Sequence, residues 1–276
     1  MTDGVSFIGT GNMGGALIHA ACRALDPEQV HITDYLADKA CAMAGELGCG
    51  YVSSNSEAVK ASKYIFLCVK PQVMGSVLEE IAPVLETCAK EGMDKVVVSI
   101  AAGLPIGFFK DRLPVNDRIH IIRVMPNTPA AIGKGMLAVA AGPEVASEYV
   151  DDVCHILSDA GRVERISESL MDQFSVAGGC APAFVYMFIE AMADGAVLTG
   201  APRAQAVTWA AQTVLGAAAM VLETGVHPGA LKDAVCSPGG STIAGVATLE
   251  KYGFRSSVIE AVRAGYEKTL ELGRVK

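Results

Sequence analysis

The sequence concentrates little charge in any one place and lacks a pattern of metal ligands. It has 22 basic and 30 acidic residues, a net charge of −8, and no run of lysine or arginine. We therefore expect no binding surface for nucleic acid or for an anionic membrane. The five histidines form no HxxH or HxxxH pair, and the eight cysteines form no CxxC pair. A metal site is not expected either.

The cysteines also lack the regular spacing of a disulfide framework. Most of them lie in apolar surroundings, where cysteine behaves as a small hydrophobic residue. This usage predicts a reduced, cytoplasmic protein. The first apolar strand begins at Val5, so we expect no signal peptide.

One stretch without charge, residues 204–222, has the length of a membrane span. It is rich in alanine and contains two glutamines and two threonines, which makes it less apolar than a typical spanning helix. In the wider segment 175–222 the charged residues are Glu190, Asp194 and Arg203. Helices that are apolar on nearly every side must be covered by other helices. We therefore predict an oligomer and no membrane span.

A glycine-rich turn follows the first strand, residues 5–8, and leads into a helical pattern at residues 16–25. That order is the dinucleotide-binding fingerprint in the context that it requires. Gly9 permits the tight turn, Gly11 lets a pyrophosphate approach the backbone, and Gly14 lets the helix pack closely on the strand. We predict that NADH or NADPH binds at this turn.

The second strand, residues 30–33, ends at Asp34, 20 residues after Gly14. An acidic residue at this place can bind both ribose hydroxyls of NAD and would repel a 2′-phosphate. Asp34 could equally cap the next helix, residues 36–47. Lys39 could instead turn toward a phosphate, so the choice between NADH and NADPH stays open.

Strands and helices alternate through the first part of the chain, and then the strand signals stop. Further strands are expected at residues 51–52, 64–69, 96–100, 119–124 and 135–141. Helices alone are expected later, at residues 167–177, 182–199, 202–224, 228–235, 243–252 and 256–272. We predict an α/β Rossmann-like domain with a mostly parallel sheet at residues 1–164, then an all-α domain at residues 165–276. The helix expected at residues 146–159 would lead out of the first domain.

A second glycine-rich stretch, Ser237-Pro238-Gly239-Gly240-Ser241-Thr242, stands between two of these helices. Its proline fixes one φ angle, its glycines permit unusual backbone shapes, and Ser241 and Thr242 can cap a helix that begins near Ile243. The N–H groups at such a helix start suit a carboxylate or a phosphate. An ordinary helix cap explains the same residues.

Four motifs, taken together in this order, resemble pyrroline-5-carboxylate reductases over essentially the whole chain. They are Phe7-Ile8-Gly9-Thr10-Gly11-Asn12-Met13, Val69-Lys70-Pro71-Gln72, Arg123-Val124-Met125-Pro126-Asn127-Thr128-Pro129, and the 237–242 stretch with Leu249-Glu250 and Gly253-Phe254-Arg255 after it. The resemblance implies a Rossmann domain and a helical substrate-binding and dimerisation domain interlocked with that of a partner. The implied reaction is the last step of proline synthesis, in which NAD(P)H reduces the imine 1-pyrroline-5-carboxylate to L-proline. A homodimer follows, alone or within a larger ring.

The resemblance also implies roles for individual residues. The cofactor side comprises the turn at Gly9, Thr10, Gly11, Asn12 and Met13, then Asp34, Asn55 beside the adenosine ribose, and Val69, Lys70 and Pro71 beside the nicotinamide half. On the substrate side, backbone amides of the loop from Ser237 through Gly239, Gly240 and Ser241 hold the carboxylate. Thr242 is the catalytic residue, and its hydroxyl reaches the ring nitrogen while hydride goes to the imine carbon. Whether Thr242 donates a proton or only orients the substrate stays open.

One departure and two alternatives accompany this interpretation. Gly178-Gly179-Cys180-Ala181-Pro182-Ala183 stands where the family usually has Ser-Gly-Ser-Gly-Pro-Ala, so two hydroxyls are missing. A β-hydroxyacid dehydrogenase or related imine reductase shares the domain order. The former family places a catalytic lysine on the helix after its second glycine-rich stretch, and residues 178–198 contain no lysine. A non-catalytic dinucleotide sensor would keep the first glycine-rich turn and would have no need of the 237–242 loop.

Overall fold

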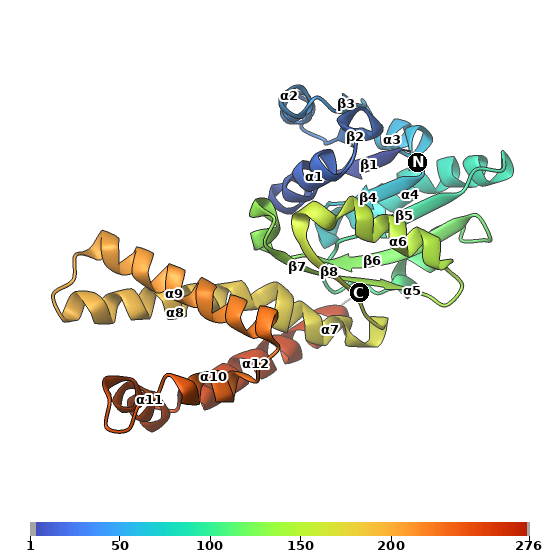
Figure 1. Ribbon diagram of the computed structural model, residues 1–276. Coiled ribbons are helices and arrows are strands. Elements are labelled where there is room, and N and C mark those ends of the chain that lie inside the picture. Colours follow the sequence, from blue (N-terminus) through green and yellow to red (C-terminus); the bar gives the residue numbers. More distant parts are fainter. Residues whose placement is uncertain (1–3, 275–276) are drawn as a thin grey trace. The chain divides into compact units, whose positions relative to one another are not determined.

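The computed structural model describes residues 4–274 (Figure 1). The ends of the two predicted domains, residues 1–3 and 275–276, lie outside the described residues. Eight strands form one sheet: β1 (Val5–Ile8), β2 (Val30–Thr33), β3 (Gly50–Tyr51), β4 (Tyr64–Leu67), β5 (Lys95–Ser99), β6 (Ile119–Met125), β7 (Gly135–Ala141) and β8 (Gly161–Arg165). The helical elements between the strands are α1 (Asn12–Ala24), η1 (Pro27–Gln29), α2 (Ala37–Leu47), α3 (Asn55–Ala61), α4 (Pro71–Lys90), α5 (Ile106–Lys110), η2 (Thr128–Ile132), α6 (Ser147–Ile156) and η3 (Ser158–Ala160).

The strand order in the sheet is β3-β2-β1-β4-β5-β6-β7-β8. Only β6 and β7 pair in antiparallel fashion among the described strands, and the other neighbours are parallel. The mostly parallel sheet predicted from the alternating pattern is confirmed. The strand order reverses at β1, which pairs with β2 on one side and with β4 on the other. In sheets of this kind ligands bind at the carboxyl ends of the strands beside such a switch point.

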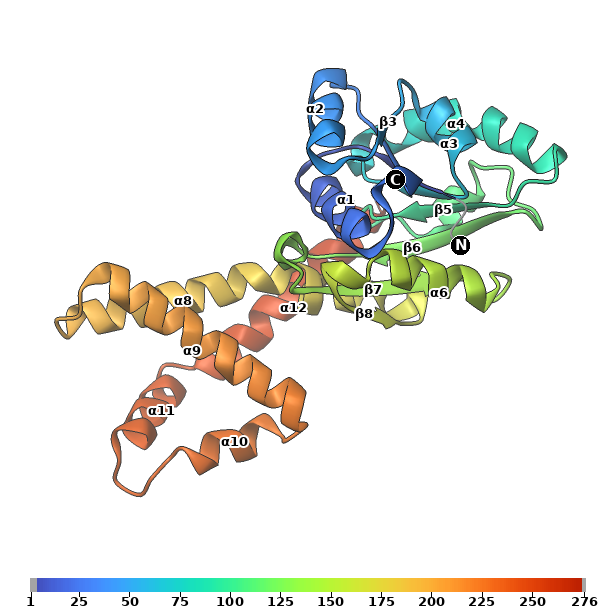
Figure 2. The same cartoon turned by 45° about the horizontal axis from the view of Figure 1, so that its top comes forward.

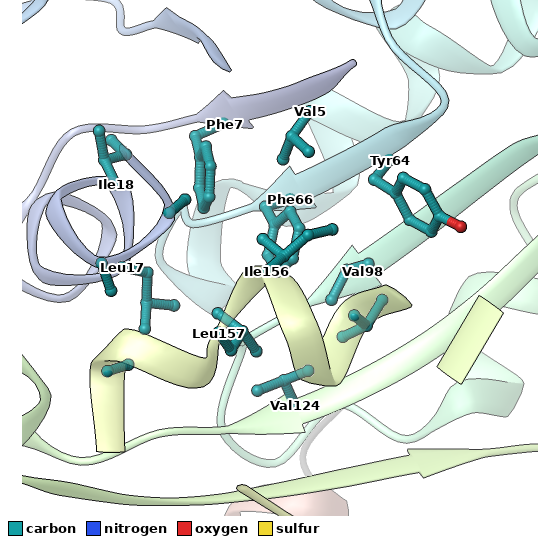
Figure 3. Packing of buried hydrophobic residues seen from close by; sticks show 14 of the residues in the cluster. Val5, Phe7, Leu17, Ile18, Tyr64, Phe66, Val98, Val124, Ile156 and Leu157 are labelled. Carbon is teal, nitrogen blue, oxygen red and sulfur yellow. The ribbon is translucent and has the colours of Figure 1, made fainter. Parts of the chain in front are cut away.

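Apolar side chains bury both faces of the sheet, which is why its strands read as continuous apolar runs. Figure 3 shows one face, where Phe7 of β1 and Phe66 of β4 lie between the side chains of α1 and the end of α6. Their rings stack with centroids 4.6 Å apart, a contact worth about 0.5–1.5 kcal/mol beyond the buried area. The opposite face packs on α4 through Met74, Leu78 and Ile81. This core holds the carboxyl ends of β1, β2 and β4 in register.

The last strand of the sheet is a correction to the sequence analysis. The helix expected at residues 146–159 does not lead out of the domain, because the chain returns from α6 as β8, parallel to β7. The strand was missed because it is a partly exposed edge strand with three charged residues, Arg162, Glu164 and Arg165. An edge strand that faces solvent lacks the apolar run that marks a central strand.

After β8 every described element is helical, as predicted. These elements are η4 (Glu168–Leu170), α7 (Met171–Phe174), a π-helix η5 (Ser175–Cys180), α8 (Ala181–Leu198), α9 (Arg203–Thr224), α10 (Pro228–Ala234), α11 (Ser241–Lys251) and α12 (Phe254–Arg274). The chain divides into two compact units. The first unit runs to Cys180 and resumes at Tyr266, and the second comprises Ala181–Gly265. The domain division after residue 164 stays a prediction.

In the second unit α8 and α9 lie side by side (Figures 1 and 2). The small side chains of Ala193, Ala206 and Ala210 are buried between them. Large apolar side chains on the same helices stay exposed, among them Tyr186, Met187, Trp209, Leu215, Met220 and Leu222. By length and composition alone, Glu168–Leu198 and Arg203–Thr224 could each cross a membrane. The unit thus carries apolar surface that it does not cover itself.

Candidate functional site

The glycine-rich turn after β1 has the geometry of an anion-binding turn. Gly9 has a φ of +106°, and a side chain there would approach the carbonyl of Cys68. A Cβ on Gly14 would lie 2.2 Å from the Gly9 carbonyl oxygen, whereas a Cβ on Gly11 would meet nothing within 4 Å. Gly11 is also the N-cap of α1, and no side chain caps this helix end. The first turn of α1 therefore fits a pyrophosphate, which would approach the open side of Gly11.

The loop after β4 borders the same turn. Strands β1 and β4 pair, and the side chain of Val69 lies 3.3 Å from where a Cβ on Gly9 would stand. Lys70 is the N-cap of α4 and Pro71 is its first residue. The structure thus brings together two segments that are about sixty residues apart in the sequence, as expected for the carboxyl ends of neighbouring parallel strands.

Asp34 lies beside the turn and is held by it. Its Oδ2 accepts hydrogen bonds from the Thr10 backbone N–H at 2.6 Å and from the Thr10 hydroxyl at 3.0 Å. Its Oδ1 accepts the Leu36 N–H at 3.0 Å. Burial raises the pKa of Asp34, but the hydrogen bonds from Thr10 and Leu36 and the charge of Lys39 outweigh it and lower the pKa. The side chain does not cap α2, whose N-cap is Leu36, so that alternative is wrong and Asp34 is instead part of a local clamp.

The other predicted cofactor residues lie at helix starts. Asn12 and Met13 open α1, with Asn12 exposed. Asn55 opens α3 behind the capping hydroxyl of Ser54, and its amide donates to Glu80 of α4 at 2.7 Å. A helix start offers backbone N–H groups to an anion, which is consistent with the predicted roles.

The 237–242 loop forms a turn followed directly by a helix. The Gly240 N–H donates to the Ser237 carbonyl at 3.0 Å, and Gly239 has a φ of +69°. Pro238 and Gly239 thus stand where a type II turn favours proline and glycine. Helix α11 begins at Ser241, two residues earlier than predicted.

The predicted capping role of Ser241 and Thr242 is wrong. The cap position needs extended backbone, and Gly240 occupies it with φ −78° and ψ 169°. Ser241 and Thr242 instead form the first turn of α11, and no side chain caps this end. Their exposed hydroxyls therefore stand beside a helix start that suits an anion. The loop belongs to the second unit and the glycine-rich turn to the first.

Arg123 and Asn127, at the end of β6 and just beyond it, are buried polar residues to which the sequence analysis assigns no role. Arg123 lies 3.7 Å from Glu168 and 3.6 Å from Asp172. Burial lowers the pKa of Arg123, although both carboxylates act to raise it. Asn127 donates to the Gly178 carbonyl at 2.8 Å and accepts the Met136 N–H at 3.0 Å. The available signal was the presence of polar residues at the end of an apolar strand.

No three His, Cys, Asp or Glu side chains within residues 4–274 gather as metal ligands would. The eight cysteines are free thiols.

Comparisons with known proteins find matches in both units. Residues 168–272 match the family model described as pyrroline-5-carboxylate reductase dimerisation, and residues 4–103 match the one described as NADP oxidoreductase coenzyme F420-dependent. The chain is 44% identical to the pyrroline-5-carboxylate reductase of Escherichia coli (strain K12), over 99% of this chain and 100% of that protein.

Solved structures give the same result. A pyrroline-5-carboxylate reductase from Coxiella burnetii is 28% identical with a TM-score of 0.90, over 99% of both chains. The pyrroline carboxylate reductase of Plasmodium falciparum with NADP bound is 33% identical with a TM-score of 0.83, over 98% of both chains. Because the likeness extends from the glycine-rich turn of the first unit to the helices of the second, the chain belongs to the pyrroline-5-carboxylate reductase family.

Proposed function

We propose that the protein reduces 1-pyrroline-5-carboxylate to L-proline with NADH or NADPH. The observation that carries the proposal is the 44% sequence identity to a pyrroline-5-carboxylate reductase, which extends over 99% of this chain and all of that protein. The matched length includes both the glycine-rich turn of the first unit and the 237–242 loop of the second. A dinucleotide sensor would need only the former.

On the cofactor side, the backbone of the turn after β1 receives the pyrophosphate. The open side of Gly11 and the uncapped first turn of α1 support this role. Val69 borders the same turn and limits the space next to it. When bound, NADH or NADPH supplies the hydride that the imine carbon accepts.

On the substrate side, backbone amides make the main contacts with the substrate carboxylate. The uncapped start of α11 holds the substrate carboxylate, supported by the turn that Gly239 and Gly240 allow. A cyclic imine is already electrophilic, so the protein mainly has to position it. The Thr242 hydroxyl bonds the ring nitrogen, and this bond either orients the substrate alone or also gives it a proton.

The helical unit forms a homodimer with a second copy of the chain. Exposed side chains such as Trp209 and Leu222 make a monomer unfavourable in water, and the matched family model is that of a dimerisation region. A second copy of the chain covers this apolar surface, so the two apolar helices need no membrane. Dimers can assemble further into a ring, and the eight free thiols support a cytoplasmic location.

The test is oxidation of NADH or NADPH, followed by absorbance, on addition of pyrroline-5-carboxylate. Thr242→Ala should lower kcat/KM by about 100-fold or more, while Thr242→Ser should retain most of it. An unchanged kcat/KM for Thr242→Ala would remove both the proton-transfer and the orienting role. Oxidation of hydroxyacids instead would indicate a β-hydroxyacid dehydrogenase. Cofactor binding without any turnover would indicate a sensor.

A further inference from the structure

A π-helix joins α7 to α8, and a proline explains where it lies. Residues 171–198 are helical throughout, with the π-helix at Ser175–Cys180 and Pro182 two residues beyond it. In an α-helix the Gly178 carbonyl would accept the N–H of residue 182. Proline has no N–H, and its ring crowds the carbonyl four residues earlier. A wider turn before Pro182 relieves that crowding, and a donor from outside the helix can then reach the Gly178 carbonyl.

Asn127 supplies this donor. Its Nδ2 donates to the Gly178 carbonyl at 2.8 Å, and its Oδ1 accepts the Met136 N–H of β7 at 3.0 Å. The side chain is 7% exposed, so water does not compete freely for either bond. An amide offers a donor and an acceptor together. Aspartate has no donor to offer Gly178, and an apolar residue has neither group.

A contact next to Asn127 fixes the same segment to the sheet. Met125, two residues earlier in β6, packs with Met171 and Phe174. A Cβ on Gly178 would approach the Phe174 ring to 2.7 Å. The missing hydroxyl at Gly178 is thus explained by close packing, because the Phe174 ring fills the space that a serine side chain would need.

We propose that Asn127 is a positioning residue that holds the π-helical joint, Ser175–Cys180, by replacing the donor that Pro182 lacks. Helix α8 and the second unit, with the 237–242 loop, begin at this joint. Asn127 therefore affects turnover without contacting substrate or cofactor. This inference rests on the proposed reduction of pyrroline-5-carboxylate.

The first test is Asn127→Asp, which keeps an oxygen for the Met136 N–H and faces the Gly178 carbonyl with an acceptor. We expect kcat to fall about tenfold or more because the joint is displaced. The Kd of NADPH, measured by calorimetry without substrate, should change less than about threefold. A rise in Kd that parallels the loss of kcat would overturn the proposal, since Asn127 would then act on the cofactor turn.

The second test uses Pro182→Ala, which restores a backbone N–H four residues after Gly178. In this background Asn127→Asp should lower kcat by less than about threefold, because the two changes concern the same carbonyl. Equal losses with and without Pro182→Ala would overturn the proposal. Asn127→Ser, which is smaller and uncharged, replaces Asn127→Asp in both backgrounds if the latter does not fold.

Hydrogen exchange measures the stability of the π-helical joint independently of enzyme activity. Backbone amides of residues 175–185 should exchange faster in Asn127→Asp and recover in the double variant with Pro182→Ala. Unchanged exchange in Asn127→Asp would contradict a role at the joint. A wild type that does not reduce pyrroline-5-carboxylate would refute the proposed function, while the exchange rates would still decide whether Asn127 holds the π-helix.

Discussion

One oxygen of the Asp34 carboxylate accepts both the backbone N–H and the hydroxyl of Thr10, at 2.6 Å and 3.0 Å. Thr10 is buried within the glycine-rich turn and Asp34 follows β2, so the pair ties the carboxyl ends of two neighbouring strands. The charge beside the cofactor turn is therefore fixed in place. A fixed carboxylate disfavours a 2′-phosphate.

Replacing this carboxylate should shift cofactor preference. We expect Asp34→Ser to lower the ratio of kcat/KM with NADH to kcat/KM with NADPH by about tenfold, or roughly 1.4 kcal/mol. Thr10→Val is the matched control, because it removes the hydroxyl and keeps the backbone N–H and the charge. A wild type that prefers NADPH, or a ratio that Asp34→Ser leaves unchanged, would contradict the argument.

The same carboxylate predicts a pH effect on stability. Burial raises the pKa of Asp34, yet the hydrogen bonds from Thr10 and Leu36 lower it below the ordinary value of 3.8. A group with a lowered pKa contributes stability above the ordinary value and loses it as pH falls through the folded value. The difference in unfolding free energy between wild type and Asp34→Asn should be constant from neutral pH to about 4 and shrink at lower pH. Urea unfolding across this range tests it, and a difference that shrinks already at higher pH would count against the assignment.

Two glycines of the turn should respond differently to the same substitution. Gly14→Ala places a methyl 2.2 Å from the Gly9 carbonyl oxygen, so we expect a loss of about 1–3 kcal/mol in stability. Gly11→Ala meets nothing within 4 Å and should lower stability by about 1 kcal/mol at most, because alanine is a poorer N-cap than glycine. It should weaken cofactor binding about tenfold or more, because the methyl occupies the approach of the pyrophosphate. Thermal melting and calorimetric titration separate the two, and equal melting temperatures for both variants would argue against the close packing at Gly14.

The buried guanidinium of Arg123 should matter for stability. Arg123→Met leaves Glu168 and Asp172 without their cation, and Glu168 also accepts the Ile106 N–H at 2.6 Å. Breaking a buried ion pair costs about 3–5 kcal/mol. These carboxylates are 34% and 38% exposed, so we expect roughly 2–3 kcal/mol in urea unfolding after allowing for solvent screening. Arg123→Lys keeps the charge and should lose less; equal losses for both variants would show that geometry, not charge, is decisive.

The single tryptophan reports on the oligomer. Trp209 of α9 is 55% exposed in one chain, and a partner on this helix would bury it. Its fluorescence emission should be that of a buried indole at working concentration and shift to longer wavelength on dilution. Trp209→Glu should elute as a smaller species than the wild type, with Thr87→Glu on an exposed part of α4 as the charge-matched control. Emission typical of exposed indole at every concentration would exclude α9 from the interface.

Elements with strong local patterns were predictable from sequence. Strand β1, the turn at Gly9 and helix α1 were found because glycine placement and apolar runs act within a few residues. The ends of α8 and α9 came within one residue of the structure, since turns with proline or glycine mark them. The 237–242 loop was found for the same reason, although its helix starts earlier than predicted.

The remaining features depend on contacts between distant segments. The Thr10 hydroxyl bonds Asp34 only because β1 and β2 pair in one register, and no pattern within either segment shows that. Asn127 and Gly178 are 51 residues apart, and Pro182 was the only local sign of an irregular helix between them. Edge strand β8 lacked the apolar run that identified the other strands.

The helix α12 begins in the second unit and ends in the first, where Gly273 lies close to the Gly103 carbonyl beyond β5. The helical unit is therefore an insertion within the first unit. During translation, residues 266–274 of the first unit are made after the whole helical unit. A chain stopped at residue 180 would therefore lack a piece of the first unit, the segment 266–274 that packs on it.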